Sequence, residues 1–479
     1  MARPRFENIR FGYAGAEEES TYEPSLLTDG FFDPGEFIQE AKAGRRFLFL
    51  GYKGSGKSAL AEHLRLSAEN DSNLFVTTSI LSDFPYSDLP NVVNGASELE
   101  SRLPTAWSWL ILLALFDSFS KDQGLSTEDR DHFTSALDVL GNLGLLPTPS
   151  LKKIVQVSSK KTFKISLPKF IEAGIERTSS STGDIPNFAE RLRLISATLH
   201  SPSKHLLVID GLDEVLTRNE IQYQSLSALI TESARLNMFF HRNGTPAKII
   251  LLCRTDLFER LPSANKNKIR QDSAIHLDWY HDPRQPSSSM LLTLANLRAR
   301  LVFPEVFDIF LHFFPHQVDR QDTRAFLLDL TRHTPRDFLQ LLSHVQKSST
   351  DFTLSRDNVL SGVRRYSIDY FLPEIRDELH GYVAPVHIDL AFDLIGSLRK
   401  RDFEYHELAE KASEANQFKD LPLESIIRAL FECSAIGNVH NRPGGTTYYT
   451  FRFRNRNSTL NLHDRLILHR GMWKAMNLI

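Results

Sequence analysis

The sequence predicts an α/β protein with a parallel sheet, an insertion, a helical lid domain and a C-terminal winged-helix domain. Three observations predict this fold. Short, unbroken apolar runs alternate with helical patterns over residues 1–285, which is typical of a parallel sheet covered on both faces. The pattern then becomes helical over 286–380. Residues 381–479 end with a hairpin pattern.

Five apolar runs predict the strands of the sheet. They are Phe47–Leu50, Leu74–Ile80, His205–Ile209, Lys248–Cys253 and Ala274–Leu277. About 102–199, between the second and third runs, is too long for a single crossover helix, so we expect an insertion there. In the C-terminal domain the hairpin is predicted from Ile436–Val439 and Thr446–Arg454, joined by a Pro-Gly-Gly turn.

Composition excludes several classes of protein. Lys and Arg number 56 and Asp and Glu number 59, a net charge of −3, whereas a nucleic-acid coat protein would be strongly basic. Cys253 and Cys433 lie in apolar runs, which indicates buried thiols in a reducing compartment. Trp107–Phe116 is too short to span a bilayer and predicts a buried helix. The N-terminus lacks a signal-peptide pattern, so we expect a cytoplasmic protein without a membrane contact.

A glycine-rich loop follows the first predicted strand and matches G-x-x-x-x-G-K-[ST]. Glycines let successive backbone N–H groups turn toward a phosphate, and the next helix adds its positive N-terminal end. Lys57 would reach the β- and γ-phosphates, and the Ser58 hydroxyl would ligate Mg²⁺. The predicted ATP-binding residues are Gly51, Lys53, Gly54, Ser55, Gly56, Lys57, Ser58 and Ala59.

A second acidic motif ends the third apolar run. Asp210 falls at the carboxyl edge of the predicted strand, where ligands bind in open α/β sheets, and would hold Mg²⁺ together with Ser58. Glu214 is the predicted general base for the attacking water, and Asp213 is the alternative. One of these two acids could instead cap the following helix.

The loop and the Asp210-Gly-Leu-Asp-Glu214 motif together resemble the STAND class of P-loop ATPases, nearest its NACHT-like branch. This resemblance implies that Arg254, which follows the fourth strand, senses the γ-phosphate and acts in catalysis. The alternative is a surface arginine at the start of a loop. The sequence lacks the C-terminal repeat array of large STAND sensors.

Thr334–Phe338 resembles the segment that carries the second sensor arginine of AAA+ and origin-recognition ATPases. The resemblance implies that Arg336 contacts the nucleotide. Pro335 at a helix start also has a purely local explanation.

These resemblances imply an ATPase with slow turnover that acts as a nucleotide-driven switch or assembly ATPase in bacterial defence or signalling. They also imply a protein partner and a homo-oligomer that forms on ATP, with Arg260 or Arg270 as a weak candidate for an arginine finger. A nucleic-acid-dependent ATPase and a weakly hydrolysing scaffold are the alternatives.

Two regions are candidate nucleic-acid surfaces. One is the lysine cluster of the insertion, which could equally be a solvated segment; it comprises Lys152, Lys153, Lys160, Lys161, Lys164 and Lys169. The other is the wing, where strand alternation would place Arg452 and Arg454 on one face. The helix before the wing, Leu423–Cys433, carries two acids against one arginine, which disfavours insertion into a groove and favours a wing that packs within the protein or binds a partner.

Overall fold

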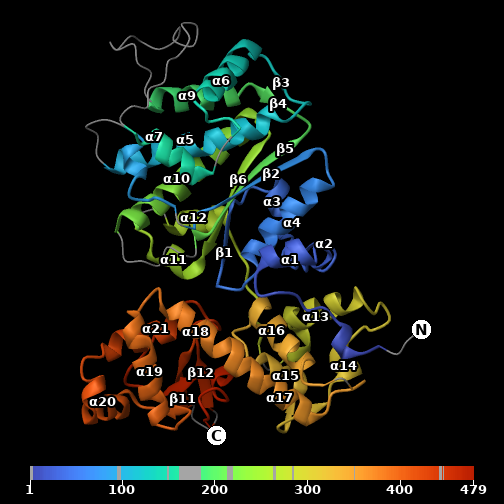
Figure 1. Ribbon diagram of the computed structural model, residues 1–479, viewed down its shortest axis with the longest axis vertical. Coiled ribbons are helices and arrows are strands. Elements are labelled where there is room, and N and C mark those ends of the chain that lie inside the picture. The colour runs from blue at the N-terminus through green and yellow to red at the C-terminus, as the bar shows by residue number, and fades with distance from the viewer. Residues whose placement is uncertain are drawn as a thin grey trace. The chain divides into compact units, whose positions relative to one another are not determined.

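The computed structural model of this chain describes residues 4–82, 84–93, 99–147, 150–160, 185–212, 220–262, 266–282, 285–349, 351–441, 445 and 447–478 (Figure 1). The chain divides into two compact units. We call Gly35–Gly51 with Lys57–Leu277 the sheet unit, and Met1–Pro34, Tyr52–Gly56 and Asp278–Ile479 the helical unit. The three-domain division expected from the sequence stays a prediction.

The sheet unit contains a five-stranded parallel sheet in the order β2-β5-β6-β1-β7. Its strands are β1 (Leu48–Gly51), β2 (Leu74–Ile80), β5 (Lys204–Asp210), β6 (Ala247–Arg254) and β7 (Ala274–His276). All five predicted strands are confirmed, with ends shifted by one residue at most. The central strands are buried on both faces, which explains their unbroken apolar runs.

Helices cover both faces of this sheet, with α5 and α10 on one face and α3 and α4 on the other (Figure 1). The helices of the sheet unit are α3 (Phe37–Ala43), α4 (Lys57–Glu69), α5 (Leu99–Ser120), α6 (Arg130–Asn142), α7 (Leu151–Ser158), α9 (Ile185–Ser196), α10 (Glu220–Asn243), α11 (Thr255–Arg260) and α12 (Lys266–Ser273). The insertion expected between the second and third strands therefore contains α5, α6, α7 and α9. It also contains β3 (Ser126–Thr127) and β4 (Leu199–His200), which pair antiparallel.

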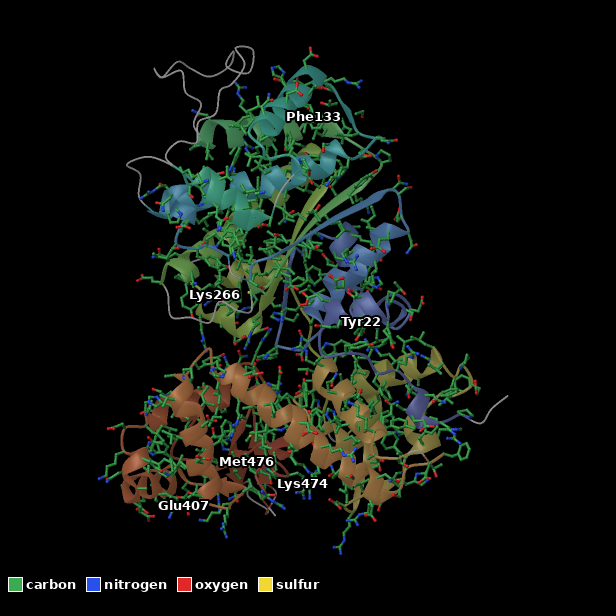
Figure 2. The ribbon with its side chains drawn as sticks, viewed as in Figure 1. Tyr22, Phe133, Lys266, Glu407, Lys474 and Met476 are labelled. Atoms are coloured by element: carbon green, nitrogen blue, oxygen red, sulfur yellow. The ribbon has the colours of Figure 1, made fainter. Side chains whose placement is uncertain are left out.

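Helix α5 is a core helix. Its span Ser101–Ser120 is long and apolar enough to cross a membrane, yet 83% of its most apolar window is buried within the protein. Trp107 and Trp109 are fully buried, and their indole N–H groups donate to Ser225 and Ser158. Phe133 of α6, labelled in Figure 2, packs on this helix from the insertion. The sequence interpretation of a buried helix is confirmed.

The helical unit combines the N-terminal segment with the helices after residue 278. Its helices up to residue 379 are α1 (Ala16–Tyr22), α2 (Ser25–Thr28), α13 (Met290–Arg300), α14 (Ile309–Phe313), α15 (Thr323–Leu328), α16 (Pro335–Gln346), α17 (Arg356–Tyr366) and α18 (Leu372–Leu379). A two-stranded ribbon, β8 (Gln317–Val318) and β9 (Gln321–Asp322), precedes α15. Phe6 and Phe11 lie in the core of this unit. A buried ion pair between Glu19 and Arg298 also holds the N-terminal segment there.

The C-terminal region has the helix, helix, helix, hairpin order predicted for a winged helix. Its elements are α19 (Pro385–Ser397), β10 (Asp402–Phe403), α20 (Tyr405–Glu414), α21 (Leu423–Glu432), β11 (Ile436–Asn441), β12 (Thr447–Thr450) and β13 (Leu466–Leu468). The strands form one antiparallel sheet in the order β10-β13-β11-β12. Both cysteines, Cys253 in the sheet unit and Cys433 here, are buried and form no disulfide with each other.

One prediction for the wing is wrong. The second hairpin strand ends at Thr450 and not at Arg454, so strand alternation does not govern the two arginines. Arg452 donates to the Ser458 carbonyl at 2.8 Å and pairs with Glu432 at 3.3 Å. Arg454 lies 3.9 Å from Asp329 and over the rings of two neighbouring phenylalanines. Both side chains are less than 20% exposed, because internal contacts hold them.

Candidate functional site

The glycine-rich loop connects the buried strand β1 to α4, as its sequence predicts. Gly54 and Gly56 have φ of 79° and 97°, a region in which side chains other than glycine are strained. A Cβ at Gly54 would also lie 3.0 Å from the Cβ of Arg336 and 3.2 Å from the hydroxyl of Thr334. Glycine at position 54 therefore serves both the curled backbone and a close approach of α16.

Two carbonyl groups of the loop accept hydrogen bonds from residues outside the loop, whereas two of its N–H groups do not donate to any described residue. The Trp279 indole donates to the Ser55 carbonyl at 2.9 Å, and the Arg336 N–H donates to the Gly54 carbonyl at 3.2 Å. Within the described part of the chain, the N–H groups of Gly54 and Gly56 have no hydrogen-bond acceptor. The two carbonyl groups are therefore already hydrogen-bonded, and the two glycine N–H groups are available as donors. A curled loop with this arrangement can bind an anion such as phosphate.

Lys57 and Ser58 open helix α4. Lys57 is buried, and its ammonium donates to the Gly51 carbonyl at 3.3 Å, back along the loop. Ser58 and Ala59 are half-buried in the first turn, where backbone N–H groups and the helix dipole favour an anion.

Asp210 is the last residue of β5, at the same carboxyl edge of the sheet as the loop. Its side chain accepts the N–H of Gly211 at 2.8 Å. Gly211 has φ of 77°, and a Cβ there would lie 2.9 Å from the backbone nitrogen of Leu81, which accounts for the Asp-Gly pair. The predicted base Glu214 and its alternative Asp213 lie outside the described residues.

Arg254 ends β6 and pairs in register with Gly51, so it lies at the carboxyl edge beside β1. Its guanidinium binds both carboxylate oxygens of Asp256, at 2.9 and 2.7 Å, and both side chains are buried. Its role as a sensor stays a prediction. Of the two arginine-finger candidates, Arg260 closes α11, and Arg270 binds both carboxylate oxygens of Glu259, at 2.5 and 2.6 Å.

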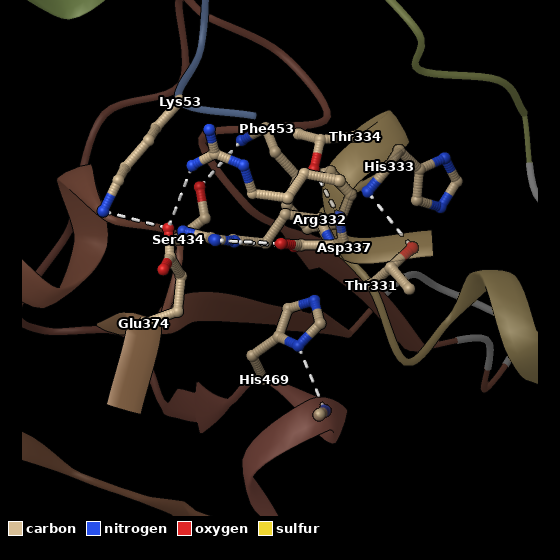
Figure 3. Close-up of polar contacts among 12 residues, drawn as sticks. Lys53, Thr331, Arg332, His333, Thr334, Asp337, Glu374, Ser434, Phe453 and His469 are labelled. Atoms are coloured by element: carbon tan, nitrogen blue, oxygen red, sulfur yellow. Dashed lines mark hydrogen bonds and ion pairs between the residues drawn. The ribbon is translucent and has the colours of Figure 1, made fainter. Parts of the chain in front are cut away.

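Two cations of the helical unit share one carboxylate near the loop (Figure 3). Lys53 lies 2.9 Å from the Glu374 carboxylate, and Arg336 lies 3.7 Å from it. Thr334 caps α16 by accepting the Asp337 N–H at 3.3 Å, which fixes the start of the helix that carries Arg336. Glu374 was not predicted, because nothing in the sequence links α18 to a loop more than 300 residues earlier.

A buried network of charged side chains lies at the start of α16, the helix that carries Arg336. Arg332 binds both carboxylate oxygens of Asp337, at 2.9 and 3.1 Å, and also pairs with Glu378. Tyr370 donates to Asp337 at 3.0 Å. Burial disfavours the charged form of both side chains, but the attraction between opposite charges outweighs it. The carboxylates raise the pKa of Arg332, and Arg332 lowers the pKa of Asp337. This network was not predicted from the sequence, in which only the capping spacing of Thr334 and Asp337 points to it.

Two histidines beside this network are buried and neutral. Burial, with Arg454 and His281 nearby, lowers the pKa of His333 to about 3. Burial and the charge of Arg332 likewise lower the pKa of His469 to about 3. Neither ring nitrogen of His333 has a hydrogen-bond partner among the described residues.

The lysine cluster is described only in part. Lys152 and Lys153 lie in α7, Lys160 follows it, and all three are exposed. Lys161, Lys164 and Lys169 lie outside the described residues. In the helix before the wing, Arg428 pairs with Glu424 at 2.6 Å, as expected from its poor match to a DNA groove.

The donor set at the sheet edge suits Mg²⁺. Ser58 and Asp210 offer a hydroxyl and a carboxylate, and oxygen atoms are the ligands that Mg²⁺ prefers. Among the described residues, no group of three His, Cys, Asp or Glu side chains forms another metal site.

No protein-family model matches this chain, and no curated protein is similar to it. The chain is similar in structure to the Aeropyrum pernix ORC1 protein, solved in complex with DNA. The sequence identity is 14%, the TM-score is 0.38, and the alignment covers 90% of this chain and 92% of the ORC1 chain.

Proposed function

We propose that this protein is a Mg²⁺-dependent ATPase that acts as a nucleotide-driven switch. The proposal rests on direct contacts of the phosphate loop with α16, α18 and Trp279 of the helical unit. Arg336 and Trp279 donate to its carbonyls, and Glu374 pairs with Lys53. A phosphate that draws the loop N–H groups inward would therefore act on α16 and α18 through these contacts.

Each residue has a defined task in this proposal. Gly54, Gly56 and Lys57 bind the phosphates, and Ser58 and Asp210 hold Mg²⁺. When bound, Mg²⁺ neutralises charge on the phosphate oxygens. Glu214, or Asp213 in its place, accepts the proton of the attacking water.

The two arginines would complete the site. Arg254 exchanges Asp256 for the γ-phosphate, and Arg336 exchanges Glu374 for the same charge. Both exchanges distinguish ATP from ADP, as a switch requires. We extend the proposal to assembly on ATP and to a protein partner in bacterial defence or signalling.

A nucleic-acid-dependent ATPase is the second candidate. The three described lysines of the cluster, Lys152, Lys153 and Lys160, are exposed, and none of these three forms an ion pair with another described residue. It could contact a phosphate backbone without reading bases. The wing is a weaker candidate, because Arg452 and Arg454 are engaged internally.

Steady-state ATP turnover tests the proposal. We expect Lys57→Ala to abolish ATP binding and Glu214→Gln to bind ATP without turning it over. If Glu214→Gln turns over normally and Asp213→Asn does not, Asp213 is the base. Normal ATP binding by Lys57→Ala would contradict the assigned site.

The same assay with single- or double-stranded DNA separates the two candidates. Strong stimulation that fades with salt, and that is lost in a Lys160→Glu, Lys161→Glu, Lys164→Glu triple variant, favours the nucleic-acid-dependent enzyme. Turnover that is indifferent to DNA favours the switch.

A further inference from the structure

The sheet unit contains a second pocket, at the edge of the sheet opposite the phosphate loop. The amino ends of three neighbouring strands line it, through Phe47 before β1, Lys204 at the start of β5 and Ala247 at the start of β6. The cavity measures about 450 Å³, within the range of small-molecule sites. Parallel strands separate their amino and carboxyl edges, so this pocket is distinct from the ATP site.

The pocket is lined by basic groups and by no carboxylate. Its charged and titratable lining residues are Lys42, Arg45, Lys204, His205, His241 and Lys248, and the buried His205 lies 3.2 Å from Asp122, a carboxylate that does not itself line the pocket. Cations gathered without acids repel one another, and a bound anion relieves that repulsion. A metal ion would add to the repulsion, so the charge selects an anionic ligand.

Lys248 is a half-buried member of this group. Its ammonium donates to the carbonyls of Glu40 at 2.5 Å and of Gly44 at 2.7 Å, which uses two of its three N–H groups. Burial and the neighbouring Lys204 lower its pKa to about 8, against an opposing effect of Glu40. The Glu40 carboxylate accepts the Arg46 N–H at 2.7 Å instead of an N–H of Lys248. Lys248 is therefore a half-buried cation held by neutral carbonyls.

The rest of the lining is apolar. Met238, which is 54% exposed, contributes a long apolar side chain to it. The other apolar lining residues are Ala43, Phe47, Leu206, Ala234, Pro246 and Ala247. A ligand that fills the pocket would place an apolar body on these side chains and its charge among the lysines and arginine.

We propose that this pocket binds a small organic phosphate with an aromatic or apolar body. The exposed Arg45 and Lys204 form the rim that recognises the phosphate, and the half-buried Lys42 and Lys248 lie further inside the lining. The site is independent of the proposed ATPase function, because it shares no residue with the phosphate loop.

Pyridoxal 5′-phosphate is a suitable probe, because it joins an aromatic ring, a phosphate and an amine-reactive aldehyde. The aldehyde carbon condenses with a lysine amine, water leaves, and borohydride then reduces the imine to a stable secondary amine. Peptide mapping by mass spectrometry identifies the labelled lysine in the full-length protein. The peptide map therefore distinguishes labelling in this pocket from labelling of Lys57 in the phosphate loop.

We expect Lys248 or Lys204 to be labelled at least tenfold faster than the exposed Lys400, and phenyl phosphate to protect it. Arg45→Gln should slow this labelling at least fivefold. Arg242→Gln is the matched control, because Arg242 is exposed next to His241 and does not line the pocket.

Two results would overturn the proposal. Equal labelling by pyridoxal, which lacks the phosphate, would show that only the reactive amine matters. Labelling of both pocket lysines at the rate of Lys400, or insensitive to Arg45→Gln, would show that the pocket has no phosphate preference.

Discussion

Two cations of the protein are compensated in opposite ways. Arg332 in the helical unit is buried between two carboxylates, and their charges raise its pKa. The half-buried Lys248 in the sheet unit has only backbone carbonyls as acceptors, and burial lowers its pKa to about 8. A compensated charge fixes local structure, whereas a poorly compensated one is prepared to respond to a ligand.

The largest effect is expected from a substitution that breaks the charge network of Arg332. Arg332→Met leaves Asp337 and Glu378 buried without their cation, and the free energy of unfolding should fall by about 3–5 kcal/mol. Urea unfolding monitored by circular dichroism measures it. Lys248→Met strands no carboxylate but leaves two half-buried carbonyls without this donor, so the same free energy should fall by only about 1 kcal/mol. Equal losses in the two variants would contradict the contrast.

A smaller effect concerns the histidines beside Arg332. His333 and His469 have folded pKa values of about 3, and an unfolded chain titrates them near 6.5. The unfolded state therefore binds more protons between these values, and stability falls as pH decreases through this window. When the pH falls from 6.5 to 5, each histidine should lower the free energy of unfolding by about 1.5 kcal/mol.

The pH slope tests this directly. His333→Asn keeps a residue that tolerates the positive φ of 53° and removes one titrating group, so the slope between pH 6.5 and pH 5 should become shallower. His380→Asn is the control, because His380 is exposed. A slope that His333→Asn leaves unchanged would mean that this histidine titrates normally.

The smallest effect concerns the shared carboxylate. Glu374→Gln removes the charge that Lys53 and Arg336 share, so ATP should bind about two- to fivefold more tightly, as for a partly exposed ion pair. Isothermal titration calorimetry measures the affinity, and Glu414→Gln on the exposed face of α20 is the control. Weaker ATP binding by Glu374→Gln would contradict an exchange of partners.

Local patterns predicted the sheet well. The three central runs are buried on both faces, which makes them unbroken in the sequence, and the positive φ at Gly211 explains the Asp210-Gly211 pair. The hairpin strand Thr446–Arg454 was predicted too long. Its alternation continues past Thr450, while contacts of Arg452 and Arg454 with Glu432 and Asp329 end the strand.

Long-range partners could not be predicted. Glu374 lies in α18 and Lys53 in the phosphate loop, and only the fold brings these charges together. Lys204 and Lys248 look like ordinary strand ends in the sequence. Their shared pocket depends on the neighbouring places of β5 and β6 in the sheet.

Hydrogen–deuterium exchange of Thr334–Gln346, with and without Mg-ATP, tests the central claim most directly. If nucleotide acts on the helical unit through the Gly54–Arg336 contact, ATP should slow exchange at the start of α16 more than ADP does. Lys57→Ala should abolish the change. ATP binding without any change in the exchange of α16 would contradict the switch.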